Sequence, residues 1–169
     1  MRFSAQAAKS ANTMPAKIKI NRIEIWGVGT SGTLTVASDG TASWEPAAYN
    51  SAAATYVYTI DNGLLSGEYV PEKVNDNDEL YKNIMAAICG DLMFVPQSTD
   101  EMFISVSLTI ERQDNSTKEE KNYFVPLTSV AWEPGGYVHY RMTVSRDVIN
   151  VSAHLNPWIN LDGPTIGFE

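Results

Sequence analysis

The stretch that decides the fold reads Ala131-Trp132-Glu133-Pro134-Gly135-Gly136-Tyr137-Val138-His139-Tyr140. Pro134 fixes its own φ, and Gly135 and Gly136 can supply the positive φ that a sharp corner needs. Apolar and polar residues then alternate from Val138 to Val144, and a second such run extends from Val148 to Leu155. Two alternating runs joined by a short polar turn predict a β-hairpin. The stretch carries no catalytic motif, so function is expected on surfaces and strand edges.

Most of the remaining chain alternates with the same period of two. Residues 18–26 predict one long strand, and a change of phase at Asn21-Arg22 indicates a bulge or a bend. Residues 103–110 form the most regular run, and their polar face carries Ser105, Ser107 and Thr109. Turn signals such as Ser38-Asp39-Gly40-Thr41 separate these runs at short intervals. Eight or nine strands arranged in this way predict an all-β fold, a two-layer antiparallel β-sandwich.

One segment departs from this pattern and predicts a short helix. Residues 75–79 offer capping side chains, and apolar residues then recur at helical spacing as far as Gly90. These residues are Leu80, Tyr81, Ile84, Met85 and Ile88. The single cysteine, Cys89, lies at the end of this segment. A buried, space-filling role fits Cys89 better than catalysis, because no local signature links it to a histidine.

Composition excludes several classes of function. The 169 residues carry a formal net charge of −8, which opposes binding to nucleic-acid phosphates or to anionic membranes. The longest apolar runs fall far short of the roughly 20 residues that span a bilayer. The first residues contain one basic side chain and no apolar segment, so the chain itself displays no secretion signal. The composition therefore favours a globular domain with a substantial core and no nucleic-acid partner.

No residue pattern indicates a cofactor, a metal site or a catalytic group. Residues 75–79 begin like a calcium loop but lack its glycine at the sixth position and its glutamate at the twelfth, so helix capping is the better interpretation. His139 and His154 lie in the two runs of the predicted hairpin and could face each other, yet two histidines without further ligands are a weak metal signal. Nucleophile elbows, phosphate loops and dinucleotide fingerprints are absent from the sequence. We therefore expect a non-catalytic protein without a cofactor.

The tryptophans raise an alternative function, that of a carbohydrate-binding β-sandwich module. An exposed indole offers a flat apolar face on which a sugar ring can stack, whereas a buried indole belongs to the core. The chain has four tryptophans, at positions 26, 44, 132 and 158. For this alternative, the candidate sugar platform is Trp26 with Trp44. It requires at least two exposed and coplanar indoles.

Five motifs, taken in their order along the chain, resemble the sequence pattern of a known family. They are Ile23-Glu24-Ile25-Trp26-Gly27-Val28 with Ser31-Gly32-Thr33-Leu34, then Trp44, Leu92-Met93-Phe94-Val95-Pro96-Gln97, Trp132-Glu133-Pro134-Gly135-Gly136-Tyr137-Val138-His139-Tyr140, and Pro157-Trp158. In this order they are similar to the fimbrillin-like pilins (type V pilins) of Bacteroides-type bacteria, over residues 17–168. Gly136 stands where the familiar pattern has a lysine.

The resemblance implies a transthyretin-like β-sandwich that is exported as a lipoprotein precursor. It implies a place at the cell surface, in or on outer-membrane fimbriae, with a signal and a lipid anchor that are not in this chain. Family members usually carry two sandwich domains, and residues 17–169 are similar to the second. Residues 1–16 are then expected to be the remnant of an upstream domain or a disordered leader.

The resemblance also implies assembly by strand donation, in which a terminal strand of one subunit completes the sheet of the next. The candidate strand is residues 165–168, with Thr165 at its start and with Ile166 and Phe168 as anchors on one face. The implied partners are other fimbrial subunits, together with a host or bacterial surface protein or a glycan as the adhesive target. A tip or accessory subunit that accepts a strand without donating one remains an equal alternative.

Overall fold

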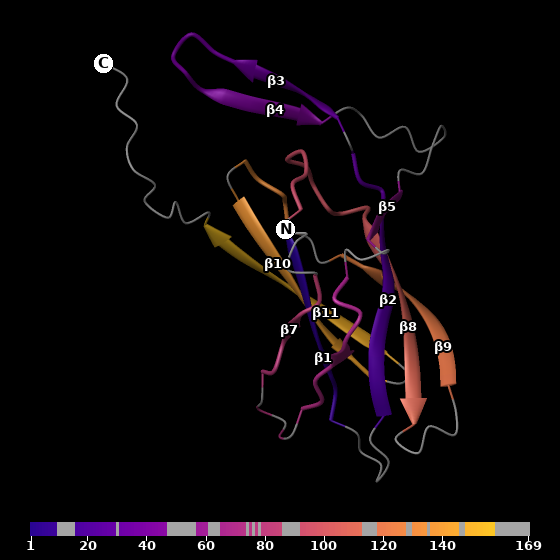
Figure 1. The fold of residues 1–169 in the computed structure, drawn as a ribbon. Coiled ribbons are helices and arrows are strands. Elements are labelled where there is room, and N and C mark those ends of the chain that lie inside the picture. The colour runs from indigo at the N-terminus through magenta and orange to yellow at the C-terminus, as the bar shows by residue number, and fades with distance from the viewer. Residues whose placement is uncertain are drawn as a thin grey trace.

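The computed structural model describes residues 1–9, 16–29, 31–46, 57–60, 65–73, 75, 77, 79–85, 92–112, 118–127, 130–134, 136–145 and 148–157. Within these ranges every regular element is a β-strand (Figure 1). The strands are β1 (Arg2–Ala7), β2 (Ala16–Trp26), β3 (Gly32–Val36), β4 (Ala42–Pro46), β5 (Val57–Ile60), β6 (Tyr69–Val70), β7 (Lys82–Asn83), β8 (Phe103–Arg112), β9 (Lys118–Pro126), β10 (Gly136–Val144) and β11 (Ile149–Pro157).

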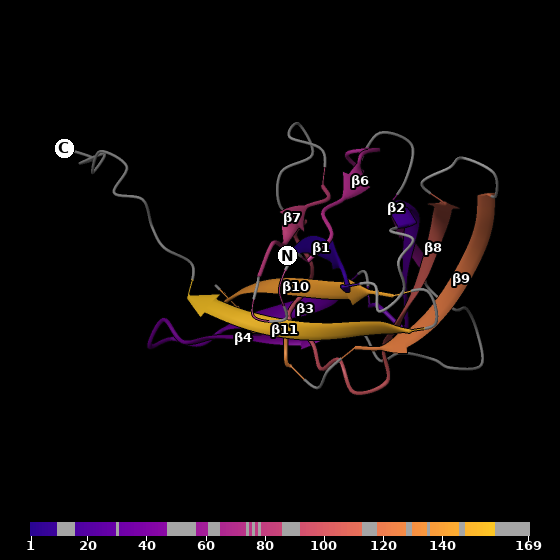
Figure 2. The same ribbon diagram turned by 90° about the horizontal axis from the view of Figure 1, so that it is seen from below.

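Two sheets form the body of the protein. One has the strand order β11-β10-β1-β7, and the other has the order β5-β2-β8-β9 with β6 also paired to β2. The sheets face each other across a single hydrophobic core, and their strands cross obliquely (Figure 1 and Figure 2). The predicted two-layer β-sandwich is therefore confirmed. Between the described strands the pairing is antiparallel except that β1 runs parallel to β10.

Alternation explains how the two sheets supply the core. In β10 the buried apolar residues are Val138, Tyr140, Met142 and Val144, and in β8 they are Ile104, Val106, Leu108 and Ile110. Every second side chain of each strand thus points to the same side, as the pleat requires. The predicted hairpin of β10 and β11 and the regular strand β8 are both confirmed.

The long strand β2 contains the predicted bulge. Its pairing with β8 shifts between Ile20 and Arg22, so Asn21 is the extra residue. On both sides of the shift the isoleucines remain buried, including Ile20 and Ile23. The bulge therefore reconciles two alternating segments that are out of phase in the sequence.

Residues 2–7 are an integral strand and not a disordered leader. They form β1, which lies between β10 and β7 and is buried along almost its whole length. The ring of Phe3 is fully buried and stacks on Tyr140, with ring centroids 5.4 Å apart. Residues 2–7 thus belong to the same sandwich as the rest of the chain. Whether residues 1–16 also represent the remnant of an upstream domain stays a prediction.

The predicted helix is wrong for the residues that the structure describes. Lys82–Asn83 form β7, which pairs with Ser4 and Ala5 of β1. The amide of Ile84 donates to the carbonyl of Phe3 at 3.3 Å, so backbone bonds to a distant strand replace bonds within a helix. Tertiary pairing here outweighs local helix propensity. Residues 86–90, including Cys89, lie outside the described residues.

The corner before β10 differs from its prediction in one detail. Gly136 is the first residue of β10, and its φ lies outside the positive range. Its amide donates to the carbonyl of Glu133 at 3.0 Å, and a Cβ at this position would lie 3.1 Å from that oxygen. Close approach of the backbone, and not positive φ, is the reason for glycine at position 136. Gly135 is not among the described residues.

Trp132 and Tyr140 join the corner to the core. The indole Nε1 of Trp132 donates to the hydroxyl of Tyr140 at 2.8 Å, and both residues are buried. Removal from water raises the pKa of Tyr140 above the ordinary tyrosine value, and the bond from Trp132 offsets part of this rise. Neutral Tyr140 is thus the form that the fold requires.

We expect Tyr140→Phe to reduce the free energy of unfolding at neutral pH by about 1–3 kcal/mol, because the buried indole N–H loses its acceptor. The wild-type protein should lose stability as the pH rises above about 10, since the folded-state pKa of Tyr140 exceeds its unfolded value. The variant should lose less over that interval. Urea denaturation between pH 7 and 11 measures both effects. Parallel pH profiles of the free energy of unfolding for the two proteins would contradict the expected difference in pH dependence.

Candidate binding surfaces

The outer face of the β5-β2-β8-β9 sheet, the side away from the core, is the first candidate surface. On β8 it carries the residues between the buried ones, namely Phe103, Ser105, Ser107 and Thr109. The larger residues opposite them on β2 and β9 are Trp26, Glu24, Arg22, Lys19, Phe124, Asn122 and Glu120. Small hydroxyl side chains along the middle strand therefore lie between taller side chains on both neighbours.

One end of the outer face is an aromatic row formed by Trp26, Phe103 and Phe124. Trp26 and Phe103 stack, with centroids 5.5 Å apart and planes inclined by 12°. Phe103 and Phe124 meet at a tilt, with centroids 6.1 Å apart. Phe124 is 69% exposed, whereas the other two rings are half-buried. The row thus offers an apolar surface to solvent at the point where the polar part of the face begins.

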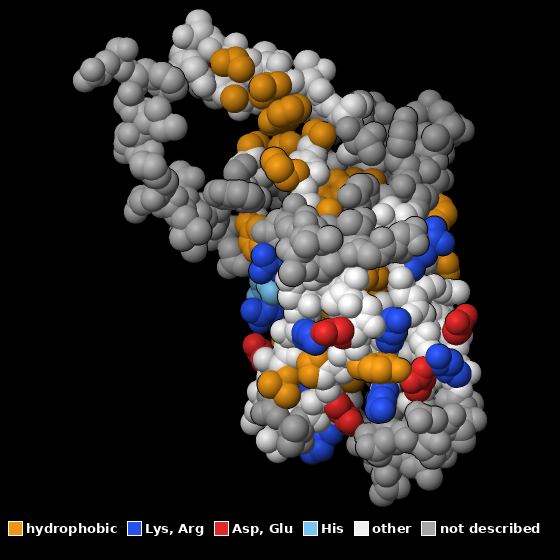
Figure 3. Space-filling model, in the orientation of Figure 1, with side chains coloured by type: hydrophobic (Ala, Val, Ile, Leu, Met, Phe, Trp, Pro, Cys, Tyr) orange, Lys and Arg blue, Asp and Glu red, His pale blue; other side chains and the backbone are white. Residues whose placement is uncertain are grey.

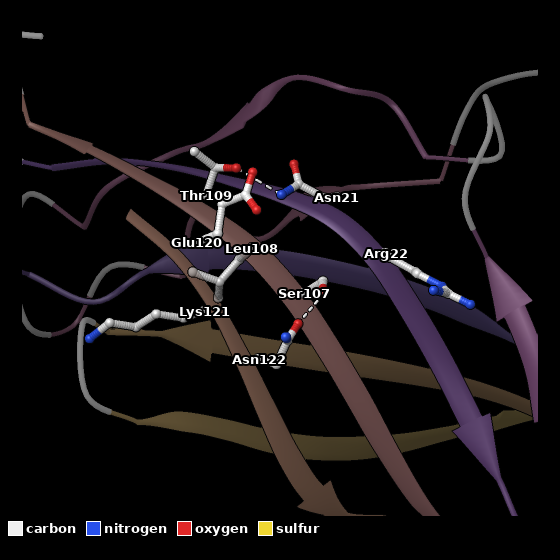
Figure 4. Close-up of a pocket in the computed structure, with 8 residues that line it drawn as sticks. All are labelled: Asn21, Arg22, Ser107, Leu108, Thr109, Glu120, Lys121 and Asn122. Carbon is white, nitrogen blue, oxygen red and sulfur yellow. Dashed lines mark hydrogen bonds between the residues drawn. The ribbon is translucent and has the colours of Figure 1, made fainter. Parts of the chain in front are cut away.

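The middle of the outer face is a polar groove of about 440 Å³ (Figure 4). Its polar lining includes Asn21, Ser107, Thr109, Glu120 and Asn122. The bulge presents Asn21, whose Nδ2 donates to Thr109 Oγ1 at 2.7 Å, and Ser107 bonds to Asn122. Figure 4 shows the Glu120 carboxylate beside the Asn21 and Thr109 pair. Hydroxyl, amide and carboxylate groups therefore converge on one depression.

The far end of the outer face is charged. The Tyr69 hydroxyl donates to the Glu111 carboxylate, and Lys118 Nζ lies 2.9 Å from the same carboxylate. The hydrogen bond from Tyr69, followed by that from Lys118, lowers the pKa of Glu111, and the bond to Glu111 raises the pKa of Tyr69. Tyr69 and Lys118 are exposed and Glu111 is half-buried, so solvent partly screens these interactions.

The hairpin of β3 and β4 is the second candidate surface. It forms a two-stranded sheet of its own, and it extends from the top of the body in Figure 1. Leu34 lies opposite Trp44 and Val36 opposite Ala42, and all four side chains are exposed. Figure 3 shows hydrophobic side chains along the hairpin, whereas Lys, Arg, Asp and Glu are mixed over the lower body. A hairpin without a partner is marginally stable in water, so this element is suited to contact another surface.

The two tryptophans of the predicted sugar platform lie on different sheets. Trp26 lies in β2 and is half-buried against Phe103, whereas Trp44 lies in β4 of the separate hairpin. Trp132 is a core residue, and Trp158 is outside the described residues. The predicted assembly strand, with Thr165, Ile166 and Phe168, also lies outside them.

The two histidines do face each other, because His139 pairs with His154 in the register of β10 and β11. Their side chains bond to serines, with His139 Nε2 2.7 Å from Ser4 Oγ and His154 Nε2 3.4 Å from Ser152 Oγ. Among the residues that the structure describes, no group of three or more His, Cys, Asp or Glu side chains could hold a metal ion. These contacts indicate a structural role for the histidines.

Sequence reasoning missed Phe103 and Phe124 as surface residues. A signal was present, since Phe124 has the same parity as Asn122 and Glu120 in residues 118–126. An aromatic residue on the polar face of an amphipathic strand is a candidate contact residue. Its proximity to Trp26 depends on the register of three strands, which the sequence does not give.

Comparison with solved structures relates this architecture to known proteins. A fimbrial protein from Bacteroides vulgatus superposes with a TM-score of 0.58 and 14% identity, over 92% of this chain and 53% of that protein. This chain has the fold of a bacterial fimbrial protein. A candidate cell adhesion protein from Bacteroides uniformis superposes with a TM-score of 0.42 and 15% identity, over 94% of this chain and 50% of that protein. The chain thus spans about half the length of each.

Comparisons of the sequence with protein families and with curated proteins give no match. Within the described residues, no helix is long and apolar enough to cross a membrane.

Proposed function

We propose that this protein is a non-catalytic fimbrial subunit that acts in assembly and adhesion at the cell surface. The observation that carries the proposal is the fold shared with a fimbrial protein over 92% of this chain. The finer parts of the proposal are a transthyretin-like sandwich, export as a lipoprotein precursor and placement in the outer-membrane fimbriae. They follow from the sequence resemblance.

The cellular location of the protein is the first property to measure, because it separates a fimbrial subunit from other β-sandwich proteins. Antibodies raised against the purified chain should label filaments at the surface of the bacterium that encodes it, as seen by immunogold electron microscopy. Labelling confined to the cell interior would contradict the proposal.

The mode of assembly that we propose is strand complementation between subunits. Its support lies in the edges of the structure. Among the strands that the structure describes, the β3 and β4 hairpin pairs with no other strand, and β9 and β11 are the last strands of their sheets. Unpaired strand edges can accept an added strand through backbone hydrogen bonds. Residues 165–168 remain the proposed donor strand, with other fimbrial subunits as partners.

A chain that ends at Pro157 tests the proposed donor. We expect this variant to keep the circular dichroism spectrum and the unfolding midpoint of the full chain, because all eleven described strands lie within residues 1–157. It should fail to form filaments under conditions in which the full chain assembles, as judged by light scattering and electron microscopy. Unchanged assembly would assign the donor strand to another segment.

Carbohydrate binding is the second candidate function, and the aromatic row with the exposed ring of Phe124 is the observation that favours it. The platform first expected, Trp26 with Trp44, is replaced in this candidate by Trp26, Phe103 and Phe124, which lie on one face. A glycan would then be the adhesive target.

A further inference from the structure

We propose that the outer face of the β5-β2-β8-β9 sheet binds a neutral, linear glycan that lies along β8, from the aromatic row into the polar groove. This inference rests on the carbohydrate-binding candidate and names its site. It is separate from strand complementation, which uses strand edges.

The shape of the face suits an extended ligand. From Phe103 to Thr109, the outer residues of β8 span about 20 Å at the usual rise per residue of a strand. Ser105 and Thr109 are only 8% and 7% exposed although they point away from the core, because taller side chains flank them. The face is therefore a trough with a floor of hydroxyl groups, and several sugar units could lie along it.

The chemistry of the face suits sugars. Phe124 presents an exposed ring for the apolar side of a sugar, beside two further aromatic rings. Beyond it, amide, hydroxyl and carboxylate groups of Asn122, Ser107 and Glu120 can donate to or accept from sugar hydroxyls. Aromatic surface combined with a few convergent polar groups is typical of small-molecule sites.

The charges favour a neutral glycan over an acidic one. Arg22 lies 2.6 Å from Glu24 on the outer face, Lys19 on β2 lies opposite Thr109, and the side chain of Lys121 points away from the groove in Figure 4. Basic and acidic side chains are thus both present along the face. Glu120 adds negative charge, and the whole chain carries −8. A sulfated or uronic acid polymer would meet repulsion.

The backbone argues against a peptide strand as the occupant. β8 is paired along both edges, with β2 on one side and β9 on the other, so its backbone groups already have partners. An added strand would need a free edge. The trough offers side chains alone, and side chains are sufficient to recognise a polyhydroxylated ligand.

Affinity electrophoresis of the purified full chain tests the proposal, in native gels that contain one polysaccharide each. The neutral probes are mannan, xylan, laminarin and hydroxyethyl cellulose, and the anionic probes are heparin and polygalacturonate. We expect retardation by at least one neutral probe and by neither anionic one. Phe124→Ala and Asn122→Ala should each raise the dissociation constant tenfold or more. The matched control is Leu155→Ala, since Leu155 is a 55% exposed apolar residue on β11 of the other sheet, and it should bind like wild type.

The outcomes distinguish the site from the function. Retardation by a neutral probe that survives both outer-face substitutions would overturn the proposed site but leave carbohydrate binding in place. Absence of retardation by all four neutral probes, or retardation by the anionic probes alone, would overturn both. Neither result would affect the fimbrial proposal, which immunogold labelling tests. Both substituted residues are exposed, so we expect the variants to fold. Circular dichroism of each variant checks that a loss of binding does not come from unfolding.

Discussion

Phe3→Ala is expected to reduce the free energy of unfolding by about 3–5 kcal/mol, the range for removing a large buried aromatic side chain. Phe3 is fully buried in the middle of the β11-β10-β1-β7 sheet and stacks on Tyr140. The substitution leaves a cavity between β1 and β10 and removes the ring contact. Urea denaturation followed by circular dichroism measures the loss.

Phe124→Ala provides the matched control, because the same atoms are removed from a ring that is 69% exposed. Its free energy of unfolding should stay within about 0.5 kcal/mol of wild type. If Phe3→Ala were as mild as Phe124→Ala, β1 would not be an integral strand of the sandwich, and residues 2–7 would fit the remnant of an upstream domain or the leader that the sequence suggested.

The sequence did not predict β1 as a strand of the sandwich, and there is a physical reason for this. Alternation in long strands is readable because one face is apolar and the other polar, as in residues 103–110. In β1 both faces are buried, and the polar side is satisfied by distant groups. Ser4 meets His139, and Gln6 bonds to Thr143 and to the amide of Leu80. Burial of polar residues is compatible with stability only when such partners exist, and no local pattern announces partners so far away in the chain.

The failed helix has the same origin. Apolar residues at positions 80–85 fit a helical period, but Ile84 and Met85 reach the core from an extended segment that pairs with β1. Because β7 pairs with β1, a sequence reading that does not predict β1 cannot predict β7 either. The outer face was partly readable, since the polar side of β8 was expected. The aromatic row was not, because it depends on the register that brings Trp26, Phe103 and Phe124 together.

Two single-residue deletions in β2 should have opposite results, and this pair is the strictest test of the register. Deleting Asn21 removes the extra residue of the bulge and leaves the sequence Ile-Lys-Ile-Arg-Ile-Glu-Ile, which alternates without interruption. The isoleucines keep their inward direction, so we expect a folded protein with an unfolding midpoint close to that of wild type. The polar groove would lose its Asn21 side chain and the bond to Thr109.

Deleting Glu24 instead places Ile23 next to Ile25, and neighbouring residues of a strand point to opposite faces. Both isoleucines are fully buried in the wild type, so one of them must turn to solvent. The loss of its burial costs about 1.5–3 kcal/mol. If Ile23 turns outward, Arg22 must also turn toward the core, where an unpaired charge costs far more. We expect this deletion to leave the chain unfolded, with a flat near-ultraviolet circular dichroism spectrum. A folded Glu24 deletion, or an unfolded Asn21 deletion, would show that the bulge lies elsewhere and that the groove has a different wall.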